Sequence, residues 1–73
     1  MSPDKLAYMA NQIGRFFSHQ PHGQAVASIT DHIQKFWDPR MRRTILSEYD
    51  TVKTRLDPLV QNAIEQLRQT GHQ

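Results

Sequence analysis

Three prolines that each follow a helix-capping residue constrain the fold of this 73-residue chain more than any other feature. The pairs are Ser2-Pro3, Asp38-Pro39 and Asp57-Pro58. A serine or aspartate side chain accepts a hydrogen bond from the first turn of a helix, and a proline at the first helical position removes no intrahelical bond. Each pair therefore predicts a helix start. Pro21 follows Gln20, a poor capping residue, and marks a weaker start. We expect helices over residues 3–18, 21–37, 39–54 and 58–69.

Apolar residues recur at helical spacing in each of these four segments. In the first segment the spacing i, i+3, i+4, i+7 begins at Leu6 and passes through Ile13, and the third segment is the least apolar. No segment alternates apolar and polar residues over the length of a strand. The short connections favour antiparallel neighbours. We predict an all-α fold, a small single-domain array of about four short helices over residues 1–70, and a C-terminal tail, residues 71–73, that frays.

The size and composition of the chain limit its class. A chain of this length buries only about 60% of the surface that its unfolded form exposes, so a partner or an oligomer can be needed for full ordering. The absence of cysteine excludes disulfide bonds and thiolate metal sites, and it suits a reducing compartment. No apolar run approaches the roughly 18 residues of a membrane span, and the N-terminus lacks the apolar stretch of a secretory signal. We therefore expect a cytoplasmic protein with no membrane partner.

The segment from Lys35 to Arg43 places two large aromatic residues, Phe36 and Trp37, directly before a cluster of arginines. The arginines are Arg40, Arg42 and Arg43. Cations in the first turn of a helix face the positive end of its dipole, at a cost of roughly 0.3–1 kcal/mol each when exposed. Such a departure from a local rule beside aromatic rings is typical of a contact site. Since Phe36 and Trp37 point about 100° apart, one can enter the core while the other turns to the rim. The alternative, in which both rings only cap the helical array, stays open.

The sequence gives little support for catalysis, metal binding or nucleic-acid binding. His19 and His22 flank a proline at His-x-x-His spacing, but no third ligand stands nearby, so we interpret them as polar junction residues. His32 lies one flank off an apolar stripe, as a boundary histidine does. The isolated glycines form no phosphate-binding loop. The arginine cluster also suits a helix-turn-helix module, yet Glu48 and Asp50 follow in the same predicted helix, and the net charge is only +2. We expect a non-catalytic chain that binds no cofactor, metal or nucleic acid.

Two sequence blocks are distinctive as motifs: Met9-Ala-Asn-Gln-Ile-Gly-Arg-Phe-Phe17 and Lys35-Phe-Trp-Asp-Pro-Arg-Met-Arg42. Three further blocks are the opening Met1-Ser-Pro-Asp-Lys-Leu6, the segment from Val26 to Ile33, and Leu56-Asp-Pro-Leu-Val60, the last of which is weaker alone. Taken in their order along the chain, the five blocks resemble the delta subunit of NAD-dependent formate dehydrogenase. The resemblance runs from the first residue to about Leu67.

The resemblance implies a non-catalytic accessory subunit of a cytoplasmic formate dehydrogenase, associated with assembly or stability of the active complex. It implies that the partner is the catalytic alpha subunit. The molybdenum or tungsten pyranopterin cofactor, the iron–sulfur clusters, FMN and NAD would then belong to the partner subunits. A transient assembly or cofactor-insertion factor, absent from the mature enzyme, is the alternative, and a small helical nucleic-acid-binding protein is a more distant one. Self-association of the isolated chain also stays open.

We expect two segments to contact that partner. In the first, Trp37 is the apolar anchor beside Phe36, and the arginines pair with acidic groups around it. The second is the polar side of the first helix, beside Phe16 and Phe17. The predicted partner-binding residues are Phe36, Trp37, Arg40, Arg42, Arg43, Asn11, Gln12 and Arg15.

Overall fold

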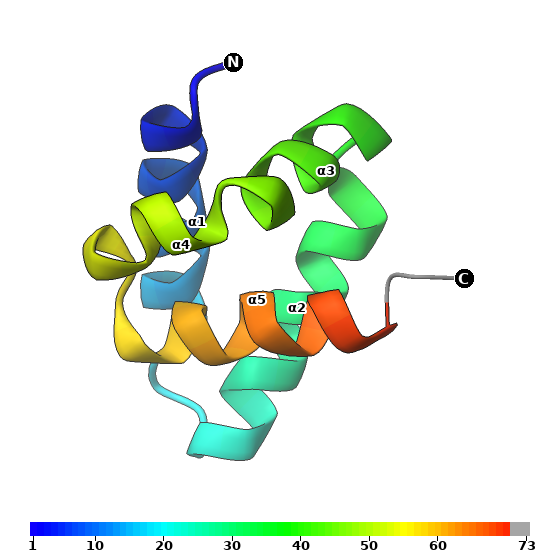
Figure 1. The fold of residues 1–73 in the computed structure, drawn as a ribbon. Coiled ribbons are helices and arrows are strands. Elements are labelled where there is room, and N and C mark those ends of the chain that lie inside the picture. The colour runs from blue at the N-terminus through cyan, green and yellow to red at the C-terminus, as the bar shows by residue number, and fades with distance from the viewer. Residues whose placement is uncertain (71–73) are drawn as a thin grey trace.

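The computed structural model describes residues 1–70, and all of the regular secondary structure in this range is helical (Figure 1). No strand occurs among these residues, so the predicted all-α fold is confirmed. The predicted tail, residues 71–73, lies outside the described residues. Within residues 1–70, no helix has both the length and the apolar character needed to cross a membrane. The elements are α1 (Pro3–Phe17), α2 (His22–Phe36), α3 (Pro39–Ser47), α4 (Tyr49–Val52), the 3-10 helix η1 (Lys53–Arg55) and α5 (Pro58–Thr70).

Local capping chemistry sets the helix starts. Ser2 Oγ accepts a backbone hydrogen bond at 3.2 Å at the start of α1, and Asp38 Oδ1 accepts one at 2.9 Å at the start of α3. These side chains satisfy N–H groups that the first turn of a helix leaves without a partner. Pro58 opens α5, as predicted. Pro21 occupies the N-cap position of α2, where no side chain caps the helix, and α2 begins at His22, one residue later than predicted.

The prediction of one continuous helix over residues 39–54 is wrong. The segment divides at Glu48, whose backbone angles, φ −101° and ψ 12°, depart from those of an α-helix. Just before this point, Thr44 Oγ1 donates to the carbonyl of Arg40 at 2.9 Å, and Ser47 Oγ donates to the carbonyl of Thr44 at 3.2 Å. Hydroxyl bonds of this kind to the preceding turn bend helices. The bend allows both α3 and α4 to pack against α1.

The helices form two layers. α1 and α2 run side by side in roughly opposite directions, and α5 crosses in front of them below α3 and α4 (Figure 1). Large apolar side chains from both layers meet between them, and each contributes about 1.5–3 kcal/mol relative to an exposed position. The largest fully buried side chains are Leu6, Ile29, Ile33, Ile45, Val52, Val60, Ile64 and Leu67.

α1 and α5 approach each other closely at Gly14. A β-carbon at this position would lie 2.5 Å from Cγ2 of Val60, which is fully buried. Real β-carbons do not tolerate so short a contact, because the interior is already densely packed. The absence of a side chain at Gly14 therefore sets the separation of the two helices.

Candidate partner-binding surface

Phe36 and Trp37 point in different directions at the end of α2. Trp37 is a core residue with 5% of its surface exposed, whereas Phe36 is 72% exposed. The indole of Trp37, which the sequence suggested as the apolar anchor of a partner contact, thus lies in the core of this chain. α2 ends at Phe36, and the extended backbone of Trp37, with φ −83° and ψ 139°, leaves the helical path so that the indole packs inward. Phe36 is the residue of the pair that a partner can reach.

Arg42 binds the end of α2. Its Nη1 donates to the carbonyl of Gln34 at 3.1 Å and also to the carbonyl of Trp37. The last carbonyls of a helix have no intrahelical donors and form the negative end of its dipole, so a guanidinium there is stabilising. Arg42 thus lies near the start of α3, and its side chain binds carbonyl groups at the end of α2. The sequence did not indicate this role, because the turn between α2 and α3 brings the two helix ends together.

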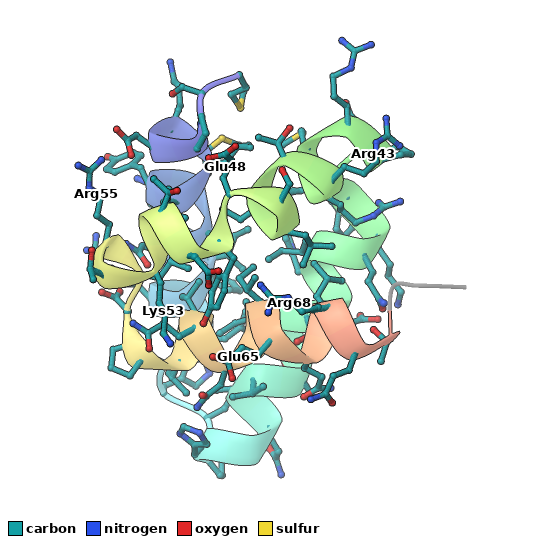
Figure 2. All side chains as sticks on the ribbon, in the orientation of Figure 1. Arg43, Glu48, Lys53, Arg55, Glu65 and Arg68 are labelled. Carbon is teal, nitrogen blue, oxygen red and sulfur yellow. The ribbon has the colours of Figure 1, made fainter. Side chains whose placement is uncertain are left out.

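Arg40 and Arg43 are the exposed members of the arginine cluster. Neither forms an ion pair with a carboxylate among residues 1–70. Figure 2 shows Arg43 at the outer edge of α3, apart from the labelled acidic residues Glu48 and Glu65. These two arginines are therefore available to acidic groups of a partner.

The residues predicted on α1 all bond within the chain. Asn11 Nδ2 donates to the carbonyl of Arg55 at 2.8 Å, and Asn11 Oδ1 accepts from the backbone N–H of Asp57 at 2.9 Å. Arg15 Nε lies 3.8 Å from Asp57 Oδ2, and Gln12 Nε2 donates to a tyrosine hydroxyl on the same helix at 3.1 Å. The Asn11 amide thus fixes the segment between η1 and α5. Gln12 and Arg15 remain exposed on α1.

Four aromatic side chains from α1 and α2 form a continuous row. Phe16 and Phe17 meet edge to face with centroids 5.0 Å apart, Phe17 and His32 lie 6.3 Å apart, and His32 and Phe36 lie 4.7 Å apart. We call these four residues the aromatic row. Its two ends, Phe16 and Phe36, are each 72% exposed, and the two rings between them are half-buried. The sequence placed Phe16 and Phe36 in separate segments, and only the packing of α1 beside α2 joins them.

A second aromatic site, around Tyr49 on α4, is buried, and its polar and charged contacts come from within the chain. Tyr49 is 2% exposed, and its hydroxyl donates to Glu65 Oε2 at 2.7 Å. The Arg68 guanidinium and the Lys53 ammonium lie 5.0 Å and 5.9 Å from the ring centroid. Burial, and then the hydrogen bond and charge of Glu65, raise the pKa of Tyr49 to about 12. We call these four residues the Tyr49 cluster; Figure 2 shows its three charged members over α4 and α5.

The described residues offer no evident metal centre. His22 Nε2 lies 3.0 Å from Asn62 Nδ2, so this ring has an amide neighbour on α5. Across residues 1–70, no group of three or more histidine, aspartate or glutamate side chains is placed to hold a metal ion.

Most of the chain matches one known protein family. The model of a family described as NADH-dependent formate dehydrogenase delta subunit, FdsD, matches residues 5–64. The matched range contains the complete aromatic row and all three arginines at the start of α3. No curated protein and no solved structure matches the chain.

Proposed function

The chain belongs to the FdsD family of NADH-dependent formate dehydrogenase delta subunits, and from this membership we propose that it is a non-catalytic accessory subunit. In this proposal it binds the catalytic alpha subunit in the cytoplasm and supports assembly or stability of the active complex. The molybdenum or tungsten pyranopterin cofactor, the iron–sulfur clusters, FMN and NAD belong to the partner subunits. This chain contributes contacts and no cofactor ligand.

The exposed aromatic row is the observation that carries the docking proposal. Phe16 and Phe36 carry no polar side-chain atom, so contact with water leaves their apolar surface unfavourably hydrated. Covering a phenylalanine side chain is worth about 1.5–3 kcal/mol. Contiguous exposed apolar surface on a small protein is typical of an interaction site. We therefore propose that the catalytic subunit covers the aromatic row.

An exposed arginine close in sequence to one end of the row supports an acidic partner. Arg40 lies four residues after Phe36 and is exposed, without a carboxylate partner in the described chain. Arginine beside aromatic residues is the composition of interface hot spots. Acidic groups of the catalytic subunit near the row would pair with this guanidinium.

The Tyr49 hydroxyl, although it has a shifted pKa, is a poor candidate for a catalytic group. Burial and Glu65 raise the pKa of the Tyr49 hydroxyl to about 12, away from neutrality. A general base needs a pKa near the working pH. The Tyr49 hydroxyl is also buried and bonded to Glu65, so it is poorly placed to meet a substrate.

Gentle affinity purification of the chain from its native host, with sizing and metal analysis of the recovered complex, tests the proposal. Stoichiometric recovery with a dehydrogenase that contains molybdenum or tungsten, iron and flavin supports a permanent subunit. Recovery with a metal-free catalytic chain alone supports the transient assembly factor instead. Recovery of the chain by itself, with intact dehydrogenase elsewhere in the lysate, contradicts both. Binding of duplex DNA with a steep salt dependence would then favour the nucleic-acid alternative.

A further inference from the structure

A concave site that shares no residue with the aromatic row lies where α2, α3 and the end of α5 meet. Its volume is about 460 Å³, within the range of pockets that hold small ligands or single side chains. Pro39, Leu46 and Leu67 supply its apolar walls, and Gln34, Arg42 and Arg43 supply polar ones. None of its lining residues is acidic. The pocket therefore combines apolar walls with two positive charges, and no acidic side chain among residues 1–70 lines it.

The Arg42 guanidinium is held in place at this pocket. Two carbonyls, of Gln34 and Trp37, bind its Nη1, and its remaining N–H groups have no partner among residues 1–70. Arg42 is also partly buried, which limits its motion. A guanidinium fixed in this way loses little conformational freedom when it binds an anion.

Among residues 1–70, no carboxylate lines the pocket or forms an ion pair with its two arginines. Three ion pairs join acidic and basic side chains in the described residues, and none of them includes Arg42 or Arg43. Arg43 is exposed and lines the pocket, and Figure 2 shows it on α3. Within residues 1–70, the two guanidiniums therefore have no carboxylate partner.

We propose that this pocket binds an aspartate or glutamate side chain next to an apolar residue, carried by an acidic segment of a partner protein. The carboxylate would pair with Arg42 and Arg43, because guanidinium forks match carboxylate oxygens. The apolar neighbour would pack against Leu46 and Leu67. That this segment belongs to the catalytic subunit rests on the proposed function; the carboxylate chemistry does not.

NMR titration of the isolated full-length chain with two capped dipeptides tests the chemistry. The probes are N-acetyl-leucyl-glutamate N-methylamide and its glutamine twin, which differ only in the carboxylate. We expect the glutamate peptide to shift the methyl signals of Leu46 and Leu67 and the Nε–H signal of Arg43. The glutamine peptide should leave these signals in place. Equal shifts with both peptides, or none with either, would overturn the proposal.

A matched pair of variants separates the pocket from general attraction to positive charge. Arg43→Gln and Arg40→Gln remove one exposed arginine each from α3, but only Arg43 lines this pocket. Arg43→Gln should weaken glutamate-peptide binding about fivefold, as expected for one exposed ion pair. Arg40→Gln should leave it unchanged, and equal losses would contradict the site.

The same variants distinguish a failure of the pocket from a failure of the proposed function. Weaker recovery of the dehydrogenase with folded Arg43→Gln than with the wild-type chain places the acidic segment on the catalytic subunit. If wild-type chain binds the glutamate peptide but recovers no dehydrogenase, the proposed function fails and the pocket chemistry stands. If wild-type chain recovers the dehydrogenase but does not distinguish the two peptides, the pocket proposal alone fails.

Discussion

The aromatic row and the Tyr49 cluster place aromatic rings in opposite circumstances. Tyr49 is 2% exposed, its hydroxyl donates to Glu65, and two cations lie near its ring face. The row has ring contacts only along its own length, and its ends, Phe16 and Phe36, are 72% exposed. The fold therefore completes one aromatic site and leaves the other uncovered. The first contributes to the stability of the chain, and the second is where we place the partner.

The largest effect should come from removing the Tyr49 ring. Tyr49→Ala leaves a cavity between α4 and α5, at a cost of about 3–5 kcal/mol in the free energy of unfolding. A domain of this size has only about that much stability, so the variant should be largely unfolded by far-UV circular dichroism at 25 °C. Tyr8→Ala is the matched control, since Tyr8 is 60% exposed and its loss should change stability by less than about 0.5 kcal/mol. Equal losses in the two variants would remove the contrast.

A smaller effect should follow from the Tyr49 hydroxyl alone. The folded state raises the pKa of Tyr49 from 10.0 to about 12, so it holds this proton more tightly than the unfolded state does. The resulting stabilisation is complete below pH 10 and is lost as the pH rises from 10 through 12, on the order of 3 kcal/mol in total. Tyr49→Phe cannot titrate, so the advantage of the wild-type chain over it in urea unfolding should shrink across that range. A difference that stays constant from pH 9 to pH 12 would contradict the assigned pKa.

Two glycines differ in a similar way, because Gly14 is packed against a neighbouring helix and Gly23 faces open space. Gly14→Ala places a β-carbon against the buried Val60, while a β-carbon at Gly23 would meet nothing within 4 Å. Overpacking costs about 1–3 kcal/mol, and the better helix propensity of alanine returns up to about 1 kcal/mol. We expect Gly14→Ala to lower the melting temperature and Gly23→Ala to leave it unchanged or raise it. Stabilisation by both substitutions would show that α1 and α5 separate without loss.

Features that depend on contacts within one helical turn could be predicted from the sequence. Ser2 and Asp38 cap the helices that follow them, because an N-cap bond involves only residues within one turn. The ion pair of Asp31 with Lys35, at 3.1 Å on α2, is another contact within one helical turn, between residues at i,i+4 spacing. The all-α fold follows from the apolar spacing. The break at Glu48 could not be read in the same way, because the spacing of Tyr49 and Val52 continues the helical pattern across it.

The candidate surface depended on contacts that no local rule supplies. Helical geometry showed that Phe36 and Trp37 diverge, but the residue at which α2 ends decides which of them is buried. The carbonyls that Arg42 binds become neighbours only through the α2–α3 turn. The link between Phe16 and Phe36 likewise requires α1 to pack beside α2. The partner-binding roles of the eight predicted residues stay predictions, with Phe36, Arg40 and Arg43 the most accessible at the α2–α3 junction.

The smallest expected effect on stability belongs to the test of the central claim. The double variant Phe16→Ala with Phe36→Ala removes both exposed ends of the aromatic row. It should unfold within about 1 kcal/mol of the wild-type chain, because little buried surface is lost. Its association with the catalytic subunit, measured by quantitative co-purification beside Tyr8→Ala, should weaken by about 2 kcal/mol or more, roughly thirtyfold. A folded double variant that recovers the dehydrogenase as well as the wild-type chain does would contradict docking through the aromatic row.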